Sequence, residues 1–368
     1  MAGRPRKECV LEEDKEVENE ITGIAEQIEE GFPEEEVQGV LEFTSYGADI
    51  FDLIAGGGVP FGKIVNLVGD NSVGKSFISS EIIAQARKKY GKNFIWRYDD
   101  AEAGYSFDSR EIWGFEIRTE EMEPSETIED FQINMDKFLN KLKSGQKGIY
   151  VVDSFDALSS LQEHEEYEEK VDAIEKGKKI PGSYAQGKAK GTNQFFRLMA
   201  NKIQQKDCIL IIVSQVRENL GAGQYAPKYR RNGGKSLDLF SSQIFWLAVA
   251  EKYTKKDTVT GVCVQVKNTK NKAGKPYREG YIDIIFDFGL DNIASNLKYL
   301  YDLKTDTGKD SKSSQKSIVW DEQEYNFHSL IKYIEDNNLE RELTRRVYKK
   351  WNDFEASIAS SDRKRRHG

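Results

Sequence analysis

The eight residues GDNSVGKS, at positions 69–76, match the pattern G-x-x-x-x-G-K-[ST]. An apolar run, KIVNLV, precedes them and a helix-like run, KSFISSEIIAQARKKY, follows them, so the loop joins a strand to the start of a helix. In such a loop the backbone N–H groups turn around phosphate oxygens, and the helix adds the positive end of its dipole. We therefore predict a phosphate site made of Gly69, Asp70, Asn71, Ser72, Val73, Gly74, Lys75 and Ser76.

Two of these residues have side chains suited to phosphoryl chemistry. We expect Lys75 to reach the β- and γ-phosphates of a nucleotide and Ser76 to ligate Mg²⁺. Asp153 ends the apolar run IYVV, and ligands gather at the carboxyl ends of strands in open α/β sheets, so we expect it beside the same metal. ATP and Mg²⁺ are the predicted cofactors. The alternatives are a Gly-rich turn without a ligand and an aspartate that simply ends a strand.

Hydrolysis also needs a group that orients or deprotonates water. The segment YDDAEAGY offers three carboxylates, Asp99, Asp100 and Glu102, at the end of a second apolar run. One or two of them could equally be helix N-caps. Spacing alone does not choose among the three.

Strand-like and helix-like segments alternate around these motifs. Apolar, β-branched runs end near residues 69, 99, 152 and 213, and helix-like segments fill 75–90, 125–143 and 192–206. This alternation indicates right-handed βαβ units and a mainly parallel sheet. Three later runs, QIFWLAVA, GVCVQVKN and GYIDIIFDF, favour hairpin strands that extend the sheet at one edge. The predicted fold class is α/β.

The charge distribution divides the chain. The net charge is −8, but residues 11–40 alone hold twelve acids and one base. We expect 1–40 to be an acidic, helical N-terminal arm that either packs one stripe on the body or contacts a neighbouring subunit. Residues 41–290 form the predicted core. Residues 291–368 form a small helical C-terminal region with a basic tail, and its two helical stretches are separated by the polar stretch 304–317.

Other bulk features exclude some classes of protein. No apolar run approaches the roughly twenty residues of a membrane span, and we see no signal-peptide pattern at the start. The three cysteines and three histidines are scattered and form no metal or redox motif. We therefore expect a soluble protein of the reducing bacterial cytoplasm, with no membrane partner and no zinc site.

Four segments, in order, resemble the ATPase core of RecA-type recombinases. They are TSYGADIFDLIAGGGVPFGKIVNLVGDNSVGKS, YDDAEAGYSF, VVDSFDAL and IIVSQVRENLG with NGGKSLDLF after it, and together they cover about residues 40–290. The resemblance implies a RecA-like P-loop ATPase core. The polar, helical C-terminal region looks more like phage-encoded relatives than like bacterial RecA, so a phage origin is also an expectation.

The resemblance also implies roles for single residues. Glu102 matches the family's catalytic glutamate, and Gln215 matches the residue that senses the γ-phosphate and couples it to a DNA-binding loop. Lys267 and Lys270, in VKNTKNK, match lysines that reach a nucleotide across a subunit interface, although each could be an ordinary surface lysine. The family's adenine-binding positions are not clearly kept: Ser106 and Ser109 fall there, with Tyr105 and Phe107 nearby.

The long polar segment 216–235 has little apolar periodicity, five bases against one acid, and four glycines. Cations can neutralise phosphates, glycines allow close approach, and tyrosines can stack on bases, which suits single-stranded nucleic acid. Upstream, the insert QEHEEYEEKVDAIEKGKKIPGSYAQGKAKG is longer and more charged than the family's first DNA loop, and only its end looks suited to DNA. The predicted DNA-binding residues are Lys188, Lys190, Arg217, Tyr225, Lys228, Tyr229, Arg230, Arg231, Gly233 and Gly234.

These motifs together favour an ATP-dependent recombinase. It would form a helical filament on single-stranded DNA, with the nucleotide at the subunit interface, and would exchange strands with double-stranded DNA. Single-strand-binding and mediator proteins are possible further partners. The alternatives are a hexameric DNA helicase, a recombination mediator without catalysis, and a regulatory ATPase of the clock-protein type that would not need the basic segment.

Overall fold

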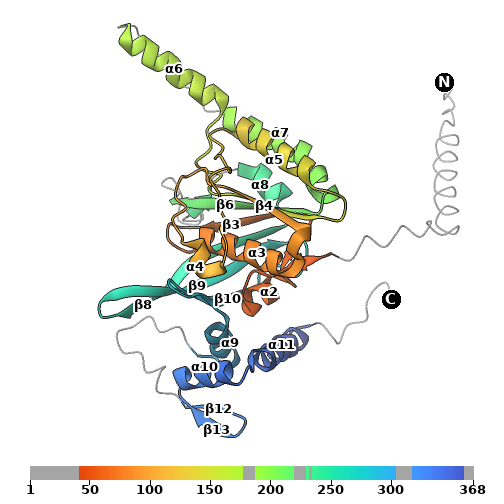
Figure 1. The fold of residues 1–368 in the computed structure, drawn as a ribbon, viewed down its shortest axis with the longest axis vertical. Coiled ribbons are helices and arrows are strands. Elements are labelled where there is room, and N and C mark those ends of the chain that lie inside the picture. Colours follow the sequence, from red (N-terminus) through yellow and green to blue (C-terminus); the bar gives the residue numbers. More distant parts are fainter. Residues whose placement is uncertain (1–40, 177–186, 219–228, 232–233, 304–316, 360–368) are drawn as a thin grey trace, which may run out of the picture. The chain divides into compact units, whose positions relative to one another are not determined.

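The computed structural model describes residues 41–176, 187–218, 229–231, 234–303 and 317–359 (Figure 1). The chain divides into two units, residues 1–42 and 43–368. The predicted acidic arm at 1–40 lies outside the described residues, as do positions 304–316 of the polar stretch. The domain boundaries at 40 and 290 stay predictions.

One large sheet carries the second unit, in the order β11-β10-β9-β8-β3-β6-β5-β4. Its parallel half consists of β3 (Ile64–Gly69), β4 (Phe94–Asp99), β5 (Lys147–Val152) and the first part of β6 (Cys208–Glu218), and β8 (Gln243–Lys255) also runs parallel to β3. The antiparallel half continues through β9 (Thr258–Asn271), β10 (Glu279–Ile285) and β11 (Gly289–Asp291). The predicted mainly parallel sheet with hairpin strands at one edge is confirmed.

Both faces of the parallel half are buried, because its apolar strand residues alternate between two cores. Ile149 and Val151 face a core shared with α2 (Asp49–Ala55) and α3 (Lys75–Tyr90). Tyr150 and Val152 face a second core with α5 (Ile128–Lys141) and α7 (Gly187–Gln205). Figure 1 shows α5 and α7 on the opposite side of the sheet from α3.

The three glycines after α2 let the chain turn sharply into the sheet. Gly56, Gly57 and Gly58 all have positive φ values, of 80°, 125° and 118°. A Cβ at Gly58 would lie 2.3 Å from the carbonyl oxygen of Thr44, where β1 (Phe43–Thr44) pairs with β2 (Val59–Pro60). Only glycine fits this turn, which fixes the end of α2 beside the sheet.

Three segments differ from the prediction. The charged insert contains a helix, α6 (Leu161–Glu175), and α7 begins at Gly187 rather than near 192. Segment 216–235, whose sequence has little apolar periodicity, contains regular structure: β6 continues to Glu218 and pairs with β7 (Tyr229–Arg231), and α8 (Gly234–Phe240) begins at its end. Residues 219–228 and 232–233 lie outside the described residues.

The C-terminal region is not purely helical. It contains α9 (Asn292–Leu300), α10 (Phe327–Asp336) and α11 (Glu340–Ser357), but also a hairpin of β12 (Ile318–Trp320) and β13 (Gln323–Tyr325). The hairpin turns at Asp321 and Glu322, both with positive φ, and its three-residue strands are too short to show a clear period. Among the described helices, none is both long enough and apolar enough to cross a membrane.

Candidate active site

The loop 69–76 lies where the carboxyl end of β3 meets the start of α3, as predicted. Gly74 caps α3 with φ at 93°, and a Cβ at Gly69 would lie 2.8 Å from the carbonyl oxygen of Leu247 on β8. The Lys75 ammonium curls back and donates to the carbonyl oxygens of Gly69, at 3.0 Å, and Asp70, at 2.7 Å. The backbone of β8 thus leaves no room for a side chain at Gly69, the positive φ favours glycine at Gly74, and Lys75 joins the end of the loop to its first two residues.

Lys75 lies among carboxylates. Its side chain is buried, and burial lowers its pKa, while Asp153, Glu102, Asp70 and Asp156 oppose that shift in this order. Phosphates bound at the loop would add negative charge beside this ammonium group and would favour its charged form.

Ser76 and Asp153 form an oxygen pair at the start of α3. Burial raises the pKa of the Asp153 carboxyl, and hydrogen bonds from Ser76 and Tyr98 oppose that shift; the Tyr98 hydroxyl donates to Asp153 Oδ2 at 2.5 Å. Hydroxyl and carboxylate oxygens suit Mg²⁺, which also takes ligands from water and phosphate rather than from a full protein cage. Among the described residues, no three His, Cys, Asp or Glu gather into a cage. The pair therefore fits a magnesium ion shared with a bound nucleotide.

The structure distinguishes the three carboxylates that spacing left open. Asp99 accepts hydrogen bonds from the backbone N–H and hydroxyl of Ser125, at 2.7 and 2.6 Å, and from the Tyr150 hydroxyl at 2.5 Å. Asp100 accepts from the backbone N–H groups of Gly104, at 3.0 Å, and Tyr105, at 3.2 Å. Both are buried and hold the turn after β4.

Glu102 differs from these two aspartates, because its side chain is exposed and its Oε1 accepts from the Gln215 side-chain amide at 2.8 Å. The Gln215 backbone N–H in turn donates to Asp156 Oδ2 at 2.6 Å. Val216, the next residue, pairs with Arg231 in the β6–β7 ribbon. A carboxylate beside Lys75 is thus connected by one side chain to the basic segment.

The ten predicted DNA-binding residues are placed only in part. Tyr225, Lys228 and Gly233 lie outside the described residues. In the ribbon, Arg217 pairs with Arg230, and Tyr229 lies opposite Glu218. Lys188 and Lys190 fall in the first turn of α7, and Gly234 begins α8.

Lys267 and Lys270 lie on β9 and have different surroundings. The Lys267 side chain is 56% exposed and its ammonium lies 3.6 Å from Glu279 on β10. The Lys270 ammonium donates to the carbonyl oxygens of Asp238 and of Leu239, the latter at 3.0 Å, near the end of α8. Lys267 is therefore available to a second molecule, whereas Lys270 already supports α8.

Near the predicted adenine positions the structure shows an aromatic group. The Tyr105 ring lies 4.7 Å from that of Tyr98 and 5.4 Å from that of Phe107. Ser109 is buried and accepts from the Ile117 backbone N–H at 3.2 Å, whereas Ser106 is exposed. Ser109 thus supports the segment after α4 (Ser109–Trp113). Of the residues that the prediction named at or near the adenine positions, Ser106 and Phe107 are the exposed ones that a ligand could contact.

Comparison with known proteins decides the family. The family model described as the RecA N-terminal domain matches residues 27–291. The chain belongs to the RecA family. It is 26% identical to Protein RecA of Nostoc sp. over 324 residues, covering 86% of this chain and 84% of that protein. It is 27% identical to Protein RecA of Brucella canis over 274 residues, covering 74% and 70% of the two chains.

Beside the RecA-family motifs lies a hollow that the sequence did not predict. Its volume is about 750 Å³, and it runs from the tip of the phosphate loop across β8 and β9. Its lining is mostly apolar and includes Trp246, Val249, Val262 and Phe286, with Gln265 and Lys267 among its polar members. The strands were predicted, but which of their residues meet at the loop depends on sheet register, which no local pattern reveals.

Proposed function

We propose that this member of the RecA family is an ATP-dependent recombinase that forms a helical filament on single-stranded DNA and exchanges strands with a homologous duplex. One contact carries the proposal: the 2.8 Å hydrogen bond between Gln215 and Glu102. It connects a candidate hydrolytic carboxylate to the base of the basic ribbon. An ATPase without a nucleic-acid ligand would have no need of that connection.

The residues around the phosphate loop support ATP binding with Mg²⁺. Lys75 and the backbone of 69–74 would hold the phosphates, and Ser76 with Asp153 would hold the metal. Bound Mg²⁺ neutralises charge that develops on the phosphates during transfer. Glu102 is exposed beside this space and would orient and deprotonate the attacking water. The Gln215 amide fixes the Glu102 carboxylate and would shift it when the ribbon moves.

The DNA side of the proposal rests on composition and topology. Cations of the ribbon and of the start of α7 would neutralise phosphates, so binding should weaken steeply with salt. Tyr225 and Tyr229 would stack on bases, which is tolerant of sequence. Lys267 and Lys270 would approach the nucleotide of a neighbouring subunit. Single-strand-binding and mediator proteins are the expected further partners, in the bacterial cytoplasm.

Electron microscopy with single-stranded DNA, Mg²⁺ and a non-hydrolysable ATP analogue tests the proposal. We expect continuous helical filaments, absent with Lys75→Ala and unchanged with Lys88→Ala, which removes an exposed cation near the other end of α3. Closed rings would favour a hexameric helicase. Isolated particles without DNA-dependent assembly would favour a mediator or a regulatory ATPase. Filaments would justify a strand-exchange assay.

A further inference from the structure

The end of β9 is fixed to the end of α2 by buried amide side chains. Asn271 donates to the Ala55 carbonyl oxygen at 2.8 Å, and Asn268 donates to that of Ile54 at 3.3 Å. Gln243 on β8 donates to the carbonyl oxygens of Ala55, at 3.0 Å, and Gly58, at 3.1 Å. All three amides are buried. The strand that carries Lys267 and Lys270 therefore has a fixed position at this end.

The turn 272–278 that follows β9 packs directly on α2. Asn271 Oδ1 accepts from the backbone N–H groups of Ala273, at 2.9 Å, and Gly274, at 3.0 Å. A Cβ at Gly274 would lie 2.9 Å from the Cα of Gly56. The two backbones are too close for any side chain, so the first half of the turn cannot shift without α2.

A carboxylate of α11 holds the second half of the turn. Both Glu355 oxygens accept from the Arg278 guanidinium, Oε2 from Nη2 at 2.9 Å, and Lys275 donates to Oε2 at 2.7 Å. The hydrogen bond from Arg278 is the first cause that lowers the pKa of Glu355 to about 2. A forked guanidinium–carboxylate pair fixes direction as well as distance. Arg278 adjoins Glu279, which lies opposite Lys267 in the sheet register.

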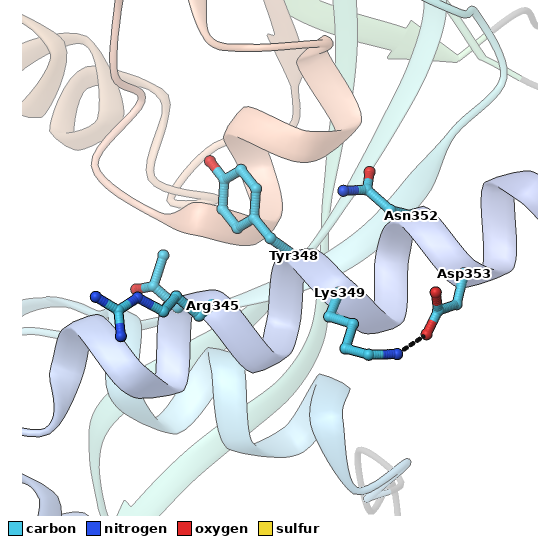
Figure 2. A pocket seen from close by; sticks show the side chains of 6 residues that line it. Arg345, Tyr348, Lys349, Asn352 and Asp353 are labelled. Atoms are coloured by element: carbon cyan, nitrogen blue, oxygen red, sulfur yellow. Dashed lines mark hydrogen bonds and ion pairs between the residues drawn. The ribbon is translucent and has the colours of Figure 1, made fainter.

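Helix α11 is itself anchored on the core. Leu343, Val347 and Trp351 are buried, and the Thr344 hydroxyl donates to Asp49 Oδ2, on α2, at 2.7 Å. Figure 2 shows Tyr348 on one side of α11, while Lys349 and Asp353 meet on another side of the helix. Glu355 thus projects from a helix with a defined place beside α2, and not from a free end.

We propose that Glu355 is a positioning residue for ATP hydrolysis in the neighbouring subunit: through Arg278 and the adjacent Glu279 it sets where Lys267 stands on the surface that meets that subunit's nucleotide. The inference rests on the proposed function, in which Lys267 and Lys270 act across the interface. It assigns the C-terminal region a role that the motifs of the core do not reveal. Small misplacements of a positioned group are costly in enzymes.

Subunit mixing tests this directly. The Glu355→Ala variant keeps its own phosphate loop and Glu102. In filaments of this variant alone, each nucleotide meets misplaced lysines of the neighbouring subunit, so we expect DNA-dependent ATP hydrolysis to fall roughly tenfold. Glu102→Gln has intact lysines but no hydrolytic carboxylate. In a filament with excess Glu102→Gln subunits, each Glu355→Ala site gains a neighbour with well-placed lysines. The ATPase rate per Glu355→Ala subunit should then return to the wild-type value.

A merely structural defect would not be repaired by a neighbour. A wild-type rate for Glu355→Ala alone, or a slow rate that mixing leaves unchanged, would overturn the proposal. Asp353→Asn is the matched control, because it removes an exposed carboxylate of the same helix that forms an ion pair with Lys349. This variant should hydrolyse ATP normally. Thermal unfolding of each variant checks that the core is intact.

The same mixture separates this inference from the proposed function. Lys267→Ala should also recover on mixing with Glu102→Gln. Recovery of Lys267→Ala without recovery of Glu355→Ala would refute only the positioning role. Failure of Lys267→Ala to recover would refute the arrangement across the interface, and the role of Glu355 would fall with it.

Discussion

The two halves of the sheet position chemistry in different ways. In the parallel half, a strand, a loop and a helix that are consecutive in sequence place Lys75 and Ser76, and the next strand ends place Asp153 and Glu102. In the antiparallel half, Lys267 lines the hollow that begins at the phosphate loop of its own chain, and Lys270 donates to carbonyl oxygens of α8. The end of the strand that carries them is held by a contact between residues more than two hundred positions apart, Asn271 and Ala55. In the proposed function, the first half binds a nucleotide with residues of one chain, whereas the lysines of the second half act at the nucleotide of a neighbouring subunit.

The largest expected effect lies in the parallel half. Glu102→Gln should lower ATP hydrolysis by about 10²–10⁴-fold, because it removes the group proposed to take the proton from water. It should leave nucleotide binding intact, since Lys75 and Ser76 remain. Steady-state ATPase assays and nucleotide titration measure the two properties. Asp99→Asn should instead destabilise the fold, because Asp99 accepts three hydrogen bonds from Ser125 and Tyr150.

The next effect concerns α2, which holds the end of β9, and it makes the free energy of unfolding depend on pH. Burial raises the pKa of Asp52, on α2, to about 7; hydrogen bonds from Ser45 and Tyr46 oppose the shift and Asp49 adds to it. The folded state therefore binds a proton that the unfolded state releases near pH 4. The associated stability is present at acid pH and is lost as pH rises toward 7, by up to about 4 kcal/mol.

Asp52→Asn removes this titration, so the unfolding free energy should vary less between pH 4 and 8 and should exceed that of the wild type at pH 8. Urea unfolding at several pH values measures it. An unchanged slope would show that Asp52 is not the titrating group. Tyr348 and Asp49, which lie near Asp52, are unchanged in this variant, so a smaller pH dependence of the unfolding free energy would be due to Asp52 and not to them.

A moderate effect should appear at the connection between nucleotide and ribbon. Gln215→Ala removes the amide that donates to Glu102. We therefore expect DNA to stimulate ATP hydrolysis about tenfold less in this variant, which corresponds to a loss of about 1.4 kcal/mol of coupling free energy. Hydrolysis in the absence of DNA should be nearly unchanged. Assays with and without single-stranded DNA measure the ratio. Equal loss in both assays would mean that Gln215 acts in the chemistry itself.

The smallest effect separates the two lysines. Lys270 donates to the last carbonyls of α8, so Lys270→Ala should lower the unfolding free energy by about 1 kcal/mol. Lys267 forms an ion pair with Glu279, and both side chains are more than half exposed, so Lys267→Ala should change the unfolding free energy by less than about 0.5 kcal/mol. Chemical denaturation compares them. Equal stabilities would contradict a structural task for Lys270.

The parallel half could be predicted from sequence because its signals are local. A strand, a glycine loop and a helix within thirty residues predict the phosphate site, and the spacing of apolar residues predicts the strands and helices of the sheet. The choice among Asp99, Asp100 and Glu102 could not be made from spacing, because it depends on Ser125 and Gln215, which are distant in sequence. The resemblance to the family, not the physics of the segment, pointed to Glu102.

The missed features share a different cause. Helix α6 lies in a segment with seven acids, whose mutual repulsion weakens the helical signal. The β12–β13 hairpin turns at Asp321 and Glu322 rather than at a glycine. The contact of Glu355 with Arg278 joins residues 77 positions apart, through the turn after β9. In the hairpin and in the contact of Glu355, no local period or motif in the chain marks the feature.

The hydrogen bond between Gln215 and Glu102 has a consequence beyond hydrolysis. If a ligand of the β6–β7 ribbon changes the affinity of the phosphate loop for its nucleotide by some factor, the nucleotide must change the affinity of the ribbon for that ligand by the same factor. In the proposed recombinase, a nucleotide that strengthens DNA binding would therefore be bound more tightly, by the same factor, when DNA is present.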